Sequence, residues 1–203
     1  MARALTLFPV LLLGLVLTAG EARADLARLE TGSPAPDFSA LGSDGRTHAL
    51  SDFAGRVVVL EWTSPVCPYT ELKYRRGLMQ AIQKRARAAG AVWLAINTSP
   101  PGRAGHLTPE AAKARLQATG SQVTSLLLDE TTSMARAYGV RTTPTLYVIG
   151  SDGRLAYQGA VDADSQKTRD DGRDHVTAAL RDLKAGRPVK LPLTRAYGCA
   201  VEY

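Results

Sequence analysis

The 203-residue sequence predicts an α/β sandwich in which a central mixed β-sheet is flanked by helices on both faces. Two continuous apolar runs, residues 57–62 and 91–97, indicate strands that are covered on both sides, as in the middle of a parallel sheet. Segments with helical spacing separate the strands. The chain then passes through a hairpin into one more helix, and this order fits a two-sided sandwich.

Turn residues and helix signals delimit the elements in the first half of the chain. Ser43-Asp44-Gly45-Arg46 favours a hairpin turn between two short strands, and residues 52–55 form a loop before the strand at 57–62. Pro68 suits the first position of a helix that extends to about Ala88, with Gly90 as its end. The apolar stripe of this helix consists of Leu72, Leu78, Met79 and Ile82.

The second half continues the alternation of strands and helices. Thr108 is expected to cap one helix, with Pro109 as its first residue, and Asp174 to cap the last helix, which ends at Gly186. The other expected segments are a strand at 91–97, a loop at 99–107, a strand at 123–128, a short helix at 132–138, and a hairpin formed by residues 145–149 and 154–160 around a turn at 151–153.

The first 24 residues have the parts of a secretory signal peptide: Arg3, an apolar stretch at residues 5–19, and Ala22-Arg23-Ala24 as a small-x-small cleavage site. An uncleaved membrane anchor is the alternative, but the stretch is shorter than the roughly 20 residues of a spanning helix and contains Pro9. We therefore expect cleavage, no stable membrane anchor, and a periplasmic or secreted protein. A single domain at residues 25–189 and a C-terminal tail at residues 190–203 would follow.

The net charge of +6 does not by itself indicate a nucleic-acid partner. Part of the basic excess lies along the expected helix at 68–88, where a solvated face is the simplest interpretation, because no interleaved aromatics or nucleic-acid motif accompany it. The histidines are too widely separated to predict a metal or haem site, and no cofactor is expected. These basic residues are Lys73, Arg75, Arg76, Lys84, Arg85 and Arg87, and the histidines are His48, His106 and His175.

The most informative residue is Cys67, which lies between the strand at 57–62 and the helix that begins at Pro68. The free N–H groups and partial positive charge of a helix start favour a thiolate. A shift of the pKa from about 8.5 to about 6 would make the thiolate the major form near neutrality. We therefore expect Cys67 to be a nucleophile. A disulfide with Cys199, the second of the two cysteines, must also be considered in an oxidising compartment.

Four segments occur in a specific order between residues 32 and 186: Ala35-Pro36-Asp37-Phe38, Trp62-x4-Cys67-Pro68, residues 139–145, and the hairpin at 146–160. Together they resemble thioredoxin-fold proteins of the redoxin group, the family of alkyl hydroperoxide reductases, thiol-specific antioxidants and periplasmic thioredoxin-like reductases. The resemblance implies a thioredoxin-like three-layer sandwich. It also implies that Thr143-Pro144 is the family's cis-proline, which lies beside the reactive cysteine and helps to dock extended substrates. A trans proline that merely opens an edge strand is the alternative.

The chain departs from thioredoxin-like reductases three residues after Cys67, where Thr70 replaces their second cysteine. This excludes a mechanism based on a Cys-x-x-Cys pair. The Cys-x-x-Thr pattern instead resembles the peroxidatic site of peroxiredoxins, whose hydroxyl can hydrogen-bond the thiolate. The match is imperfect, because Tyr69 interrupts the peroxiredoxin string and Leu60 stands where those proteins carry a proline.

The main functional hypothesis is a thiol-dependent, peroxiredoxin-like antioxidant enzyme. Cys67 would attack a hydroperoxide and become a sulfenic acid, Cys199 would condense with it, and an external thiol reductant would reopen the disulfide. One alternative is thiol-disulfide exchange with client proteins through the same cysteines. The other is a non-enzymatic binding protein with a permanent Cys67–Cys199 staple, which the chain-entropy model values at roughly 4–5 kcal/mol.

Four further residues are candidates for supporting roles. Glu61 stands six residues before Cys67, where thioredoxins hold a buried acid that moves protons, and it points either into the core with a raised pKa or to solvent. Arg141 either stabilises a thiolate or departing hydroxide or, as is commoner, covers a surface. Trp62 is expected to pack beneath the active loop. His106 follows the carboxyl end of a strand, where α/β ligands bind, although a histidine that merely lies on the surface is commoner.

Overall fold

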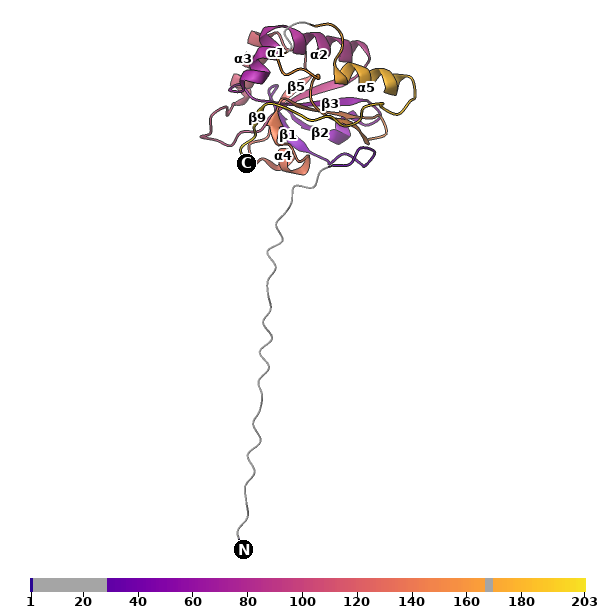
Figure 1. Cartoon of the computed structure of the whole chain (residues 1–203). Coiled ribbons are helices and arrows are strands. Elements are labelled where there is room, and N and C mark those ends of the chain that lie inside the picture. The colour runs from indigo at the N-terminus through magenta and orange to yellow at the C-terminus, as the bar shows by residue number, and fades with distance from the viewer. Residues whose placement is uncertain (2–28, 167–169) are drawn as a thin grey trace.

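The computed structural model describes residue 1, residues 29–166 and residues 170–203 of the chain. It confirms the α/β sandwich of the thioredoxin type, with a seven-stranded mixed sheet and helices on both of its faces in this part of the chain (Figure 1). Apart from Met1, the expected signal peptide lies outside the described residues. Within the described ranges, no helix is both long and apolar enough to cross a membrane.

The sheet has the strand order β2-β1-β5-β4-β3-β7-β8. At its centre, β3 (Val58–Thr63) runs parallel to β4 (Val92–Asn97) and antiparallel to β7 (Thr145–Ile149). Every residue of β3 and β4 is buried, which explains why both segments read as continuous apolar runs. The remaining strands of this sheet are β1 (Ser39–Gly42), β2 (Thr47–Ala49), β5 (Ser125–Leu128) and β8 (Leu155–Gly159).

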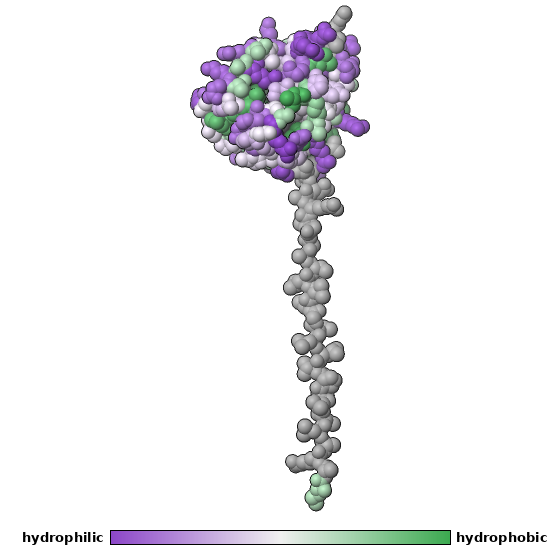
Figure 2. Space-filling model, turned by 90° about the vertical axis from the view of Figure 1, so that its left-hand side faces the viewer, coloured by the Kyte–Doolittle hydropathy of each residue, from purple (hydrophilic) through white to green (hydrophobic). Residues whose placement is uncertain are grey.

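Helices cover the two faces unequally. One face carries α1 (Pro68–Arg75), α2 (Leu78–Ala88), α3 (Pro109–Thr119) and α5 (His175–Lys184), and the other carries α4 (Ser133–Ala137) (Figure 1). A short 3-10 helix, η1 (Leu50–Phe53), follows β2. Side chains alternate along β3, so that Leu60 and Trp62 pack in the core on the α4 face, whereas Val59 packs in the core under α2 and α5. The surface seen from one side is mainly polar with small separate apolar patches (Figure 2).

The single helix expected at residues 68–88 is wrong, because the structure contains two helices there. Gly77 separates α1 from α2 with a φ of 74°, in the left-handed region that favours glycine. The apolar spacing could not reveal the break, since Leu78 and Met79 begin α2 with buried side chains and so continue the stripe. The expected N-caps are confirmed: the side chain of Thr108 accepts from the N–H of Ala111, and that of Asp174 from the N–H of Thr177.

The solvated basic face expected along this region is also wrong in part. Lys73 is fully buried, with a relative exposure of 0%. Arg85 is partly buried and forms ion pairs with Asp170 and Asp174 at 2.6 and 3.0 Å. The break at Gly77 divides these basic residues between α1 and α2, so they do not lie on one face of a continuous helix.

Candidate active site

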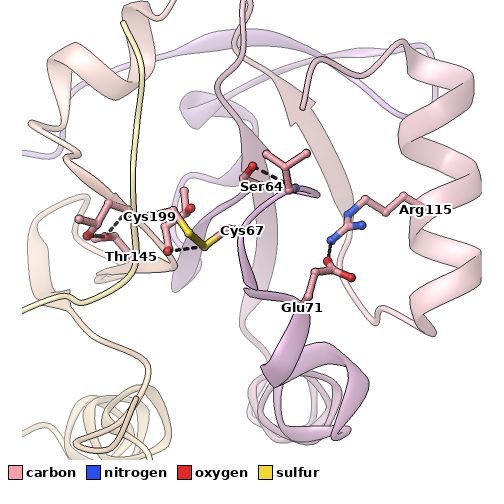
Figure 3. The surroundings of a disulfide bond; sticks show 9 residues. Ser64, Cys67, Glu71, Arg115, Thr145 and Cys199 are labelled. Atoms are coloured by element: carbon pink, nitrogen blue, oxygen red, sulfur yellow. Dashed lines mark hydrogen bonds and ion pairs between the residues drawn. A yellow bond between two sulfur atoms is a disulfide. The ribbon is translucent and has the colours of Figure 1, made fainter. Parts of the chain in front are cut away.

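The structure joins Cys67 and Cys199 in a disulfide, with their Cα atoms 5.8 Å apart and a sequence separation of 132 residues (Figure 3). The two sulfur-bearing residues differ in access. Cys67 has a relative exposure of 0%, whereas Cys199 is partly exposed. Of the two cysteines in the disulfide, Cys199 is therefore the one that solvent can reach.

Cys67 occupies the N-cap position of α1, at the end of the loop that follows β3. Its backbone is extended, with φ −88° and ψ 114°, and Pro68 takes the first helical position, where the missing N–H costs nothing. An N-cap side chain normally accepts from the N–H groups of the first turn, so a thiolate formed here would meet free donors and the positive end of the helix. The Cys67 Sγ also lies 3.1 Å from the carbonyl oxygen of Thr143, to which a protonated thiol can donate.

The cis-proline is confirmed, because the Thr143–Pro144 peptide bond is cis. Next to it, β6 (Thr142–Thr143) pairs antiparallel with β9 (Cys199–Ala200), and Thr143 lies opposite Cys199. Gly198 has a φ of 137°, and a Cβ atom at this position would overlap the Thr143 carbonyl. The tail therefore reaches the site as a strand, with glycine required at the point of closest approach.

Noncovalent contacts hold the tail on both sides of Cys199. Before the cysteine, the N–H of Thr194 donates to the carbonyl of Gln158 at 3.1 Å, and the Thr194 hydroxyl accepts from the N–H of Ala160 at 2.9 Å. After it, the N–H of Val201 donates to the carbonyl of Arg141 at 2.9 Å. The hydroxyl of Tyr203 also donates to the carbonyl of Val140. The position of the tail does not depend on the disulfide alone.

Glu61 points into the core, which settles the alternative that the sequence left open. Its carboxylate is fully buried and accepts hydrogen bonds from the Tyr74 hydroxyl at 2.8 Å, the Trp93 indole at 2.8 Å and the Gln83 amide at 3.1 Å. Burial is the largest cause acting on this group and raises its pKa to about 7, while the three donors oppose the shift. Glu61 can therefore change its protonation state near neutral pH.

Thr70 and Arg141 are placed less directly than the resemblance implies. The Thr70 hydroxyl is buried on α1 but has no hydrogen-bond partner among the described residues, so it does not contact the sulfur in the disulfide form. Arg141 is exposed and lines a cavity of about 520 Å³ under the tail. No described contact joins its guanidinium to Cys67.

Trp62 and His106 occupy structural positions. Trp62 is fully buried below the end of β3, donates to the Thr98 hydroxyl at 3.1 Å and packs against the rings of Tyr138 and Tyr147. His106 is partly exposed and pairs with Glu130 at 2.8 Å. Neither residue contributes a described contact to the disulfide.

A buried group formed by Lys73, Asp162 and Tyr197 was not predicted from the sequence. Lys73 pairs with Asp162, and the Tyr197 hydroxyl donates to the same carboxylate at 2.7 Å. A basic residue in a helix is exposed by default, and the sequence contains no signal that links these three distant positions.

Comparison with known proteins agrees with this fold. Residues 31–158 match the model of the AhpC/TSA family. The chain is 30% identical over 126 residues to the thiol-disulfide oxidoreductase ResA of Geobacillus thermodenitrificans. The aligned region covers 61% of this chain and 66%, just under two thirds, of ResA.

Two solved structures illustrate the shared fold. An uncharacterized conserved protein from Geobacillus kaustophilus is 25% identical, with a TM-score of 0.74 over 86% of this chain and 92% of that chain. A putative thiol:disulfide interchange protein DsbE from Chlorobium tepidum is 26% identical, with a TM-score of 0.53 over 64% and 84% of the two chains. Since the family model spans more than half of the sequence and the architecture agrees, the chain belongs to the AhpC/TSA family of thioredoxin-fold redoxins.

Proposed function

We propose that the protein is a thiol-disulfide oxidoreductase that exchanges its Cys67–Cys199 disulfide with the thiols or disulfides of client proteins. The observation that carries the proposal is the disulfide itself, which joins a cysteine at a helix start to a partly exposed cysteine of the tail beside a cis-proline. The similarity to ResA and DsbE proteins supports exchange more directly than it supports peroxide reduction.

The geometry favours attack on Cys199 rather than on Cys67. Thiol-disulfide exchange depends on which sulfur is accessible and on how stable the departing thiolate is. Cys199 is the accessible partner, and Cys67 would leave into the N-terminus of α1, where positive partial charge stabilises an anion. Both factors select the same direction of attack.

Exchange then proceeds in two balanced steps. A client thiolate attacks the Cys199 sulfur, the Cys67–Cys199 bond breaks, and Cys67 departs as a thiolate. The client's second thiolate then attacks the client sulfur that is bonded to Cys199 in the mixed disulfide, and Cys199 is released. The client thereby gains a disulfide and the protein gains two thiols. In the reverse direction, the Cys199 thiolate attacks a client disulfide and releases one client thiolate. Cys67 then attacks the Cys199 sulfur of the mixed disulfide, releases the second client thiolate and restores the starting bond.

A permanent structural staple explains the site less well. Such a bond stabilises a protein mainly by constraining the unfolded chain, and this effect does not require either sulfur to lie at a special place in the fold. Here the contacts of Thr194, Val201 and Tyr203 already fasten the tail without sulfur chemistry. A staple also gains nothing from placing one of its sulfurs at a helix N-terminus.

We propose supporting roles for Glu61 and Thr70. With a pKa of about 7, the Glu61 carboxyl can hold or release a proton as thiols ionise near neutrality, which agrees with the role implied by the thioredoxin resemblance. The buried Thr70 hydroxyl lacks a partner in the oxidised protein, and a thiolate at Cys67, the N-cap residue three positions earlier, would supply an acceptor. We place the activity in the periplasm or outside the cell, because the N-terminal sequence resembles a secretory signal and an oxidising compartment preserves the disulfide.

The unpartnered Thr70 hydroxyl also favours a second candidate function, peroxide reduction. A Cys67 thiolate would attack one peroxide oxygen and become a sulfenic acid while the other oxygen leaves as water or an alcohol. Condensation with the Cys199 thiol would then form the disulfide and release a second water. This route ends in the same oxidised protein as exchange with a client disulfide.

The test is to treat the oxidised protein briefly with glutathione, quench with acid, and map the mixed disulfide by mass spectrometry. We expect glutathione on Cys199 and a free thiol at Cys67. An adduct on Cys67 would contradict attack at Cys199, and complete resistance to glutathione would reject exchange. In parallel, hydrogen peroxide should produce sulfenic acid at Cys67 in reduced Cys199→Ser if the second candidate holds, whereas an unmodified Cys67 removes that candidate alone.

A further inference from the structure

The ammonium group of Lys73, a residue of α1, is buried beside the tail instead of being exposed to solvent. Its Nζ lies 2.9 and 3.1 Å from the two carboxylate oxygens of Asp162 and donates to the carbonyl of Asp164 at 2.8 Å. The Lys73 side chain is 0% exposed and that of Asp162 is 4% exposed. A pair this deep loses the hydration of both charges, so it is favourable only when every remaining hydrogen-bond position is filled.

The tail fills one of those positions. The Tyr197 hydroxyl donates to Asp162 Oδ1 at 2.7 Å, and its ring lies 5.6 Å from the Lys73 Nζ in a cation–π arrangement. Burial, followed by the bond to Asp162, raises the pKa of Tyr197 above its ordinary value, so the hydroxyl keeps its proton and remains a donor. We call Lys73, Asp162 and Tyr197 the clasp.

The clasp is close to the disulfide in sequence but contains neither sulfur. Tyr197 stands two residues before Cys199, and Lys73 stands six residues after Cys67 on α1. Release of the tail would remove a donor from the Asp162 carboxylate and open the ion pair to water. A hydrogen bond to a charged group is strong enough to change the population of a docked segment by tenfold or more.

We propose that the clasp holds the tail in place after the disulfide is reduced, so that Cys199 stays beside Cys67 and continues to cover it. Tyr197 and Asp162 are then positioning residues for renewed disulfide formation. The inference rests on the proposed exchange function. A docked tail would keep Cys199 as the sulfur that a large client can reach in both the oxidised and the reduced protein. Cys67 is fully buried under the docked tail, and a small reagent needs a smaller local opening to reach it than a large client does.

The test uses Cys199→Ser, in which no disulfide can form and Cys67 is the only cysteine. The rate of Cys67 modification by a bulky maleimide is divided by the rate with iodoacetamide, which corrects for changes in thiolate content. We expect a low ratio in Cys199→Ser and a ratio about tenfold higher after the further change Tyr197→Phe, which keeps the ring and removes the hydroxyl.

Tyr69→Phe in the same background is the matched control, because its ring lies 6.1 Å from that of Tyr197 and its hydroxyl makes no hydrogen bond among the described residues. This control should leave the ratio unchanged, and circular dichroism should show that every variant is folded. A high ratio already in Cys199→Ser, or equal ratios with and without the Tyr197 hydroxyl, would overturn the clasp. These assays involve no disulfide, so failure of the glutathione mapping would reject exchange without deciding this result.

Discussion

Two neighbouring residues of α1, Lys73 and Tyr74, each reach a buried carboxyl group, but the two groups are solvated by the protein in different ways. Asp162 faces the Lys73 ammonium, whereas Glu61 accepts only neutral donors, from Tyr74, Gln83 and Trp93. Neutral donors do not offset the loss of hydration, and the pKa of Glu61 therefore rises to about 7. The comparison separates a buried carboxyl group whose pKa lies near neutrality from one that is held in an ion pair with a lysine.

The ion-paired side of this comparison gives the largest expected effect. Lys73→Met should lower the free energy of unfolding by about 3–5 kcal/mol, because it leaves the Asp162 carboxylate buried without its cation. Urea denaturation at neutral pH measures the loss. The double variant Lys73→Met/Asp162→Leu should recover most of it, since no unpaired charge then remains. A single variant that loses less than about 1 kcal/mol would show that the pair is not as enclosed as described.

The neutral side predicts a somewhat smaller effect that depends on pH. The pKa of Glu61 is about 7 in the folded protein against 4.5 for an ordinary carboxyl, so its contribution to stability is complete below about pH 4.5 and is lost as the pH rises through 7. The loss is on the order of 3 kcal/mol. Glu61→Gln should remove this dependence, because an amide does not ionise.

Comparing the free energies of unfolding of wild type and Glu61→Gln at pH 5 and pH 8 measures this effect. The variant should gain stability relative to wild type at the higher pH. If the free energy of unfolding changed equally with pH in both proteins, Glu61 would already be ionised at pH 5. Its pKa would then not be raised by burial, which would contradict the comparison drawn above.

Much of the fold could be predicted because it depends on local signals. The buried strands β3 and β4, the cap at Asp174 and the turn at residues 43–46 follow from apolar runs and from residues with strong backbone preferences. The break at Gly77 was missed because one glycine is compatible with a helix that is otherwise well patterned. Local patterns determine the elements better than the breaks between them.

The site was predictable in its centre and not at its margin. Cys67 could be placed at a helix start from sequence order alone, and the reach of the tail allowed Cys199 to approach it. The burial of Lys73 could not be foreseen, because its partners come from the loop after β8 and from the tail, and only the folded chain brings them together. The need for glycine at position 198 could not be foreseen either, because it arises from the close approach of the Thr143 carbonyl in the folded chain.

The reduction potential of the Cys67–Cys199 disulfide tests the central claim most directly. Stabilisation of the Cys67 thiolate at the start of α1 favours the reduced protein, while the clasped tail favours the disulfide. Equilibration with glutathione or dithiothreitol buffers, read by mass spectrometry of trapped thiols, gives the value. A functional exchange disulfide should lie above about −300 mV, and a value below that limit, typical of structural bonds, would contradict the proposed function.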